Sequence, residues 1–200
     1  MNKVMTPSVS RGFSGSYPPE DVTFLLKRVR MSPTPVEEKE RRIQTGAAHY
    51  SEMISAEPRP DARYLALFEE ACGTGVPRLA RDVRALTGQI LNLVCAGRLN
   101  TKVTLCSLVR AGVPYGVLLR RDLLRVGVDV AHFGVSIIRD RGLDATAMRY
   151  VLAGRPADGV IFVDGWTGKG AISTELDLSW RAIAGRAPLL AVIADPCGRA

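Results

Sequence analysis

The sequence predicts an α/β protein whose core is a doubly wound parallel sheet, preceded by an N-terminal helical extension. Two observations support this. Four short apolar runs rich in strand-forming residues follow one another from residue 103 onward, and helical segments separate them. Such alternation is typical of a parallel sheet covered on both faces by helices. Residues 1–98 lack it, so we expect an irregular segment and helices packed on a core of residues 99–200, which is truncated at its C-terminus.

The first half of the chain predicts helices divided by Pro- and Gly-rich breaks. Thr34 can cap one helix, and Glu37 stands where a capping box places its acid. Glu37–Arg41 and Glu38–Arg42 are pairs at i,i+4 spacing on the polar face of that helix. Asp61 begins the next helix, and the stretch GTGVP separates it from a third. The expected helices cover about residues 22–26, 35–56, 61–72 and 78–97.

The second half predicts four strands with a helix between each pair. Val, Ile and other strand-forming residues dominate the apolar runs, and polar or Gly-rich turns bound them. The expected strands are 103–108, 128–138, 159–164 and 189–195. The expected helices are 117–124, 145–152 and 171–184, with a polar loop at 139–144.

Composition and charge exclude several classes of protein. The chain of 200 residues is 46% hydrophobic and 24% charged, which is ordinary for a globular protein. No apolar run approaches the roughly 20 residues of a membrane span, and the first residues do not resemble a secretory leader. We therefore expect a cytoplasmic protein without a membrane partner. The net charge of +7 is spread along the chain and often paired with acids, so nucleic acid is not the expected partner.

The cysteines and histidines do not predict a metal cluster or a catalytic dyad. The four cysteines are Cys72, Cys95, Cys106 and Cys197, and none forms a CxxC pair. Cys95 and Cys106 sit among apolar residues and are expected in the core. Cys197 follows the last strand and is the better candidate for a nucleophile. His132 alternates with buried positions and is expected in the core, whereas His49 is expected at the surface.

The stretch VIFVDGWTGKGAI, Val160–Ile172, predicts an anion site. Ligands of open parallel sheets bind beyond the carboxyl ends of the strands. Asp164 ends the strand, and the turn Thr167–Gly170 presents backbone amides at the start of a helix, which suits a phosphate. Thr167 adds a hydroxyl and Lys169 a positive charge, while Asp164 suits sugar hydroxyls or a Mg²⁺ ion held through water. The spacing is too short for a Walker loop. The alternative is a tight βα turn with Lys169 in solvent.

The loop after the first strand of the core predicts a second anion contact. Its small residues, Ala111 and Gly112, let the backbone approach a ligand, and Arg110 can bind oxygens bidentately. The alternative is a compact turn with Arg110 on the surface. If both loops bind, they form two cradles that face one crevice.

Several long motifs resemble a known family. They are GFSGSYPPEDVTFLLK, EKERRIQTGAAHYSEM, SLVRAGVPYGVLLRR, FGVSIIRDRGLD, VIFVDGWTGKGAI and IADPCG. Together they resemble the predicted phosphoribosyltransferases of bacterial tellurite-resistance and stress gene clusters. This group is also labelled as the N-terminal domain of a cysteine protease, StiP. The resemblance covers almost the whole chain and implies a type I phosphoribosyltransferase-like fold.

The resemblance implies an enzyme that binds phosphoribosyl diphosphate (PRPP) with Mg²⁺ and transfers phosphoribose to an acceptor. Related folds often dimerise, so a homodimer is compatible with it. Gly165 replaces the second acid of the type I motif, and this leaves two alternatives: a catalytically silent phosphosugar- or nucleotide-binding module, or a cysteine protease. Arg139, Asp140 and Arg141 would lie near the mobile hood. The implied ligand contacts are Arg110, Ala111, Gly112, Asp164, Gly165, Thr167, Gly168, Lys169 and Gly170, of which Asp164 and Arg110 would be catalytic.

Overall fold

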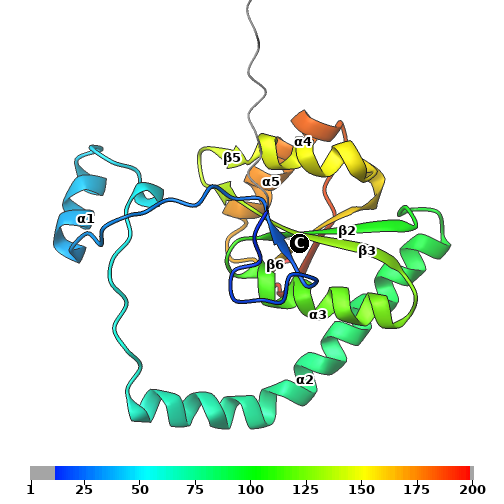
Figure 1. The fold of residues 1–200 in the computed structure, drawn as a ribbon, viewed down its shortest axis with the longest axis horizontal. Coiled ribbons are helices and arrows are strands. Elements are labelled where there is room, and N and C mark those ends of the chain that lie inside the picture. The colour runs from blue at the N-terminus through cyan, green and yellow to red at the C-terminus, as the bar shows by residue number, and fades with distance from the viewer. Residues whose placement is uncertain (1–11, 199–200) are drawn as a thin grey trace, which may run out of the picture. The chain divides into compact units, whose positions relative to one another are not determined.

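The computed structural model describes residues 12–198, and its core is a five-stranded sheet in which every pair of neighbouring strands is parallel (Figure 1). The strand order is β1-β3-β2-β6-β7. The prediction of an α/β fold with a parallel central sheet is therefore confirmed. The strands are β1 (Thr23–Phe24), β2 (Lys102–Leu108), β3 (Asp129–Val135), β6 (Val160–Trp166) and β7 (Leu190–Ala194).

The chain divides into two compact units. Within the described residues, one unit takes in 12–26 together with 79–198, and it contains the whole sheet. The other is Lys27–Arg78. No helix in the described residues is long and apolar enough to cross a membrane.

Helices cover both faces of the sheet, as the alternation of strand residues requires. Val103 and Leu105 of β2 pack with α3 (Gly112–Arg125) and the second half of α2 (Ala62–Cys95). On the other face, α4 (Ala145–Gly154) and α5 (Ala171–Ala184) cover a core that includes Cys106 and Leu108 (Figure 1). Phe162 and Trp180 meet edge to face there, with ring centroids 5.1 Å apart.

The path of the chain through the sheet defines where a ligand fits. From the central strand β2, the crossover through α3 leads to β3 on one side. The crossover through α4 then carries the chain past β2 to β6 on its other side. The strand order therefore reverses direction between β2 and β6, and a crevice at the carboxyl ends of these two strands is the usual ligand site of such sheets.

The unit Lys27–Arg78 contains less helix than predicted. The helix α1 covers only Val36–Gln44, followed by a 3₁₀ turn, η1, at Tyr50–Glu52. The expected cap at Thr34 is wrong, because Pro35 takes the N-cap position without a side-chain bond. The helix stops because Gly46 has a left-handed φ of 68°, which breaks the helical path.

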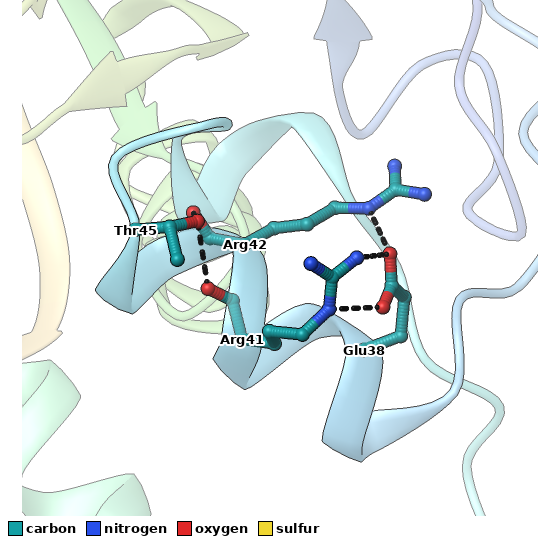
Figure 2. Close-up of polar contacts among 4 residues, drawn as sticks. All are labelled: Glu38, Arg41, Arg42 and Thr45. Carbon is teal, nitrogen blue, oxygen red and sulfur yellow. Dashed lines mark hydrogen bonds and ion pairs between the residues drawn. The ribbon is translucent and has the colours of Figure 1, made fainter.

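The predicted charge pairing of α1 is partly confirmed. Figure 2 shows that Glu38 binds both Arg41 and Arg42, with the shortest nitrogen–oxygen distances at 2.7 and 2.6 Å. The hydroxyl of Thr45 donates to the Arg41 carbonyl at 2.9 Å and closes the last turn. Arg41 thus pairs with the acid three residues before it, and the predicted partner Glu37 is not used.

The predicted break at GTGVP is wrong, because α2 runs as one helix of 34 residues with Pro77 inside it. Its start is as expected: the carboxylate of Asp61 accepts a bond of 2.7 Å from the Tyr64 amide. Gly and Pro each weaken a helix interior. Ending one helix and starting another would leave four carbonyls and four amides without helical partners. Continuing the helix avoids that loss.

Two predicted elements near the site also differ. The segment 22–26 contains the short strand β1 (Thr23–Phe24) instead of a helix, because the backbone of these two residues pairs with β3. The expected strand 128–138 stops at Val135, and β4 (Ile137–Ile138) then pairs antiparallel with β5 (Gly142–Leu143). The loop predicted at 139–144 is therefore largely the turn and second strand of a small hairpin. The helix predicted at 117–124 begins earlier, at Gly112.

Candidate functional site

The loops after β2 and β6 lie against each other at the reversal point of the sheet. A side chain at Gly112 would meet the carbonyl oxygen of Val163 at 2.0 Å, so only glycine fits there. A side chain at Gly165 would meet Cβ of Ala111 at 3.2 Å. The small residues of the two loops therefore allow their backbones to pack closely at this point of the sheet.

A cavity of about 370 Å³ opens at this crevice. Its volume lies in the range of small-molecule sites. It brings together Asp164, the turn Thr167–Gly170 and Ala111, and Arg139 of the hairpin turn joins them. Sequence reasoning named all of these residues as part of the site or close to it. It did not name Trp166, a large exposed aromatic between Gly165 and Thr167 that also lines the cavity.

Arg110 faces a different cavity from the one that contains Asp164. Arg110 lines a neighbouring cavity together with residues of the N-terminal segment, while Ala111 lines the Asp164 cavity. The peptide bond between Val109 and Arg110 is cis. Gly112 is buried beneath the loop and begins α3. The two cradles expected in one crevice therefore belong to two cavities, one lined by Arg110 and the other by Ala111.

Asp164 is half-buried inside β6, two residues before the strand ends at Trp166, whereas the predicted strand ended at Asp164 itself. Its Oδ1 accepts a bond of 2.7 Å from the Gly165 amide. Burial raises the pKa of the Asp164 carboxyl, and the bond from the Gly165 amide opposes that rise. A carboxylate with this surrounding can accept hydrogen bonds from a ligand's hydroxyls.

The two ends of the turn after β6 differ in their hydrogen bonds: the first is bonded to β7, and the second has backbone amides that could donate to a ligand. The Thr167 amide donates to the Ala194 carbonyl at 3.0 Å, and its hydroxyl donates to the Asp195 carboxylate. Thr167 thus fastens the turn to β7, which sequence reasoning had not foreseen. The amides of the next three residues, Gly168 to Gly170, make no hydrogen bond within residues 12–198. Gly170 is the N-cap residue of α5 and has a φ of 90°, a conformation that glycine adopts readily. These amides therefore immediately precede the first turn of α5.

The cysteines differ strongly in exposure. Cys106 has no exposed surface, and burial raises the pKa of its thiol to about 12. It is inert as a nucleophile. Cys95 is exposed, so its expected core position is wrong. Cys72 is half-exposed, and Cys197 is exposed just beyond β7, at the edge of the sheet where β6 also ends.

Neither histidine is paired with a cysteine in the described part of the chain. His132 is buried as expected; its Nε2 lies 2.7 Å from the Ser107 hydroxyl, and its Nδ1 lies 2.8 Å from the Asp21 carbonyl oxygen. Burial lowers the pKa of His132 to about 4. His49 is part-exposed and its Nδ1 lies 2.7 Å from the Ser51 hydroxyl. His132 is therefore a neutral structural histidine.

The comparison with known proteins decides the family. The family described as "Tellurite-like stress resistance cysteine protease StiP" matches residues 15–200. The chain belongs to the StiP family. It is 50% identical over 171 residues to the "Cysteine protease StiP" of Acinetobacter baylyi. That match covers 86% of this chain but 43% of the relative, so the chain spans less than half of the relative's length. No solved structure matches the chain.

This membership corrects the functional prediction. The resemblance to phosphoribosyltransferases led to the expectation of an enzyme that transfers phosphoribose from PRPP. The family and the relative are both named as cysteine proteases, so that expectation is wrong, and StiP and stress resistance are the parts of it that hold. The sequence feature that argued against a transferase was Gly165, which stands where the type I motif has its second acid.

Proposed function

We propose that this chain is the ligand-binding α/β unit of a StiP-type cysteine protease, and that the Asp164 cavity binds a phosphorylated small molecule without transferring any part of it. One observation carries the proposal: Asp164, Lys169 and three amides without a hydrogen-bond partner among residues 12–198 line or border a single cavity at the reversal point of the sheet. This is where open parallel sheets bind ligands.

The chemistry of the cavity suits a phosphosugar. The amides of Gly168 to Gly170 stand at the start of α5, where the helix dipole favours an anion. Lys169 is exposed and adds a positive charge beside them. Asp164 suits the hydroxyls of the sugar. With Gly165 in place of an acid, the loop has one carboxylate, which is enough to hold hydroxyls.

A Mg²⁺ ion fits this site only in company with the ligand. No group of three or more metal-binding side chains occurs in the described residues. Proteins often hold Mg²⁺ through one or two carboxylates together with phosphate oxygens. Asp164 could supply such a carboxylate, and the phosphate of the bound ligand would supply further oxygen ligands.

The topology supports a type I phosphoribosyltransferase-like fold as the origin of this unit. The run β3-β2-β6-β7 is parallel and doubly wound, and its two ligand loops follow β2 and β6. This similarity is one of strand order and loop position, and it does not extend to phosphoribosyl transfer.

Calorimetric titration tests the binding. Ribose 5-phosphate and inorganic pyrophosphate, each with and without Mg²⁺, are the probes. We expect ribose 5-phosphate to bind, and Asp164→Asn or Lys169→Ala to weaken it about 10-fold or more, because each removes a charge-assisted contact. Lys102→Ala is the matched control, since it removes the same charge at the other end of the neighbouring strand. Absence of binding by both probes, or an equal loss with Lys102→Ala, would refute the proposal.

A second candidate function follows from Cys197. Its thiol is exposed, and it lies two residues after Asp195, the carboxylate that fastens Thr167 in the wall of the cavity. We infer that Cys197 is the nucleophile of the protease. A peptidyl thiol-reactive probe should label it, with Cys95→Ser as a control that removes another exposed thiol. Peptide hydrolysis should disappear in Cys197→Ser. Hydrolysis that survives this substitution would refute the assignment.

A further inference from the structure

The outer edge of β7 is an open strand edge. This strand pairs with β6 on one side, and no strand within residues 12–198 pairs with its other side. Its sequence, LAVIA, is apolar throughout, yet none of its five residues is buried, whereas the first four residues of β6 all are. Natural edge strands are usually protected by charged residues, proline or a bulge, and Leu190–Ala194 contains neither a charge nor a proline. The edge is therefore open to pairing with another strand.

The backbone of β7 presents a row of donors and acceptors on this edge. The Phe162 amide of β6 donates to the Leu189 carbonyl at 2.8 Å. Because a parallel pair bonds through every second residue of a strand, this bond assigns the odd-numbered residues of β7 to β6. The amides and carbonyls of Leu190 and Val192 therefore point away from β6, and neither residue bonds to another part of residues 12–198. An extended polypeptide presents donors and acceptors at the matching spacing.

A cavity of about 380 Å³ lies at the start of this edge. Pro188 and Leu190 line it from the β7 side, and residues of α5 between Ser173 and Leu178 line the rest. Leu178 is 64% exposed, so its apolar side chain is uncovered beside the strand. The cavity therefore suits an apolar side chain of a strand laid along β7, in the way that side-chain pockets accompany strand addition in other proteins.

The other end of the same edge leads to the exposed Cys197. Asp195 and Pro196 separate this cysteine from Ala194, the last residue of β7, so a strand paired with β7 runs toward its thiol. Five residues of extended chain span about 17 Å. Pairing over so short a strand is small against the roughly 1,200 Å² that a stable interface buries. The edge therefore fits a transiently bound polypeptide better than a second copy of the chain.

We propose that the open edge of β7 binds the substrate polypeptide of the protease as an added strand, with an apolar side chain in the cavity beside Leu178. This proposal rests on the second candidate function, since it describes how a substrate reaches the Cys197 nucleophile. Backbone bonds to Leu190 and Val192 supply affinity for any sequence, and the cavity adds a preference for an apolar residue. The edge therefore favours unfolded chains, whose backbone is free to pair, over folded proteins.

Binding of α-lactalbumin that has been reduced, carboxymethylated and thereby unfolded tests the proposal, with native α-lactalbumin as the folded control. Fluorescence anisotropy of the labelled probes is measured with Cys197→Ser protein, so that the proposed nucleophile cannot hydrolyse them. We expect the unfolded probe to bind at least about 10-fold more tightly than the native one, because several backbone bonds form only with an extended chain. The difference should persist at about 0.5 M salt, which screens attraction to the net charge of +7 but affects backbone pairing little.

Two variants test the edge and the cavity separately. Val192→Pro removes an amide that points away from β6, a position where an edge strand tolerates proline, and should weaken binding of the unfolded probe about 5- to 10-fold. Val192→Thr keeps the amide and is the matched control. Leu178→Ser changes an exposed side chain without altering the backbone and should weaken binding about 3- to 10-fold. In the protein with Cys197 intact, Val192→Pro should raise KM for peptide hydrolysis and leave kcat unchanged.

The outcomes separate the edge site from the proposed nucleophile. Absence of binding, equal binding of the unfolded and native probes, or binding that disappears at high salt would refute the edge site. Unchanged binding in both Val192→Pro and Leu178→Ser would refute it as well. Hydrolysis that survives in Cys197→Ser would refute the nucleophile alone, since the binding measurement does not depend on that thiol. A dimer in analytical ultracentrifugation that Val192→Pro dissociates would assign the edge to a second copy of the chain instead.

Discussion

At the scale of single residues, the surroundings of each thiol decide its reactivity. Cys106 has no exposed surface, and its pKa is raised to about 12 by burial. We predict that iodoacetamide at pH 8 labels Cys95 and Cys197 in the native protein and leaves Cys106 unmodified, because only the exposed thiols reach the reagent as thiolates. Mass spectrometry of the peptides measures this. In urea, Cys106 should react like the others, and native labelling at that same rate would contradict the prediction.

His132 makes stability depend on pH. Burial lowers its pKa from 6.5 to about 4, while Asp21 and Arg120 act on it with opposite signs. The unfolded chain therefore binds the extra proton between about pH 6.5 and 4, so the contribution of His132 is complete above pH 6.5 and is lost as pH falls toward 4. We predict a loss of about 3 kcal/mol between pH 7 and 4 from this group, measured by urea unfolding.

Asp21 affects the free energy of unfolding in a different pH range from His132. Its bond with Arg121 holds the pKa of the Asp21 carboxyl below the usual value of 3.8, so its effect on stability appears only at lower pH. His132→Asn should be less stable at pH 7 but should lose most of the slope between pH 6.5 and 4. A wild-type free energy of unfolding that stays flat across this range would be inconsistent with a neutral, buried His132.

At the scale of elements, α2 carries helix-weakening residues that offer a direct test. Gly73 and Gly75 lie inside the helix, with open space where a side chain would stand. We predict that Gly73→Ala and Gly75→Ala each stabilise this part of the helix by about 1 kcal/mol. Hydrogen exchange of the amides in residues 62–78 measures the effect.

Gly46 is the matched control, because it also has open space around it but a φ of 68°. Gly46→Ala should destabilise its turn, since alanine resists the left-handed conformation. Equal effects at Gly46 and Gly75 would mean that conformation does not decide the outcome.

The elements also show which sequence signals were reliable. The start of α5 at Ala171 was predictable, because an apolar strand with an acid near its end, a Gly-rich turn and an apolar helical stretch follow one another. The continuous α2 was not, since two glycines and a proline are local signals for a break. The pairing of β1 with β3 depends on a partner more than 100 residues away, and no local pattern contains it.

At the scale of the whole molecule, the two units differ in how much they bury. Within Lys27–Arg78, all of which is described, Met53 is the single buried apolar side chain. The unit with the sheet buries Trp180, Phe162 and many aliphatic residues. We predict that urea unfolds Lys27–Arg78 first, because little apolar burial stabilises it.

Two probes can separate the units. The chain has two tryptophans, and Trp166→Phe leaves Trp180, buried against Phe162, as the reporter of the sheet unit. Helix content by far-UV circular dichroism should begin to fall at lower urea than Trp180 fluorescence. Coincident transitions would instead indicate one cooperative unit.

The sequence by itself determined the local structure: the periodic strands and helices, the parallel α/β class, and the acid-and-glycine turn from Asp164 to Gly170. These features depend on residues close together in the chain, so a local pattern contains them. The tertiary structure alone decided that Arg110 and Ala111 face different cavities, that Asp195 fastens Thr167, and that the N-terminal rings meet the β2 loop. Each depends on strands brought together from distant parts of the chain, and strand order is set by packing of the whole sheet.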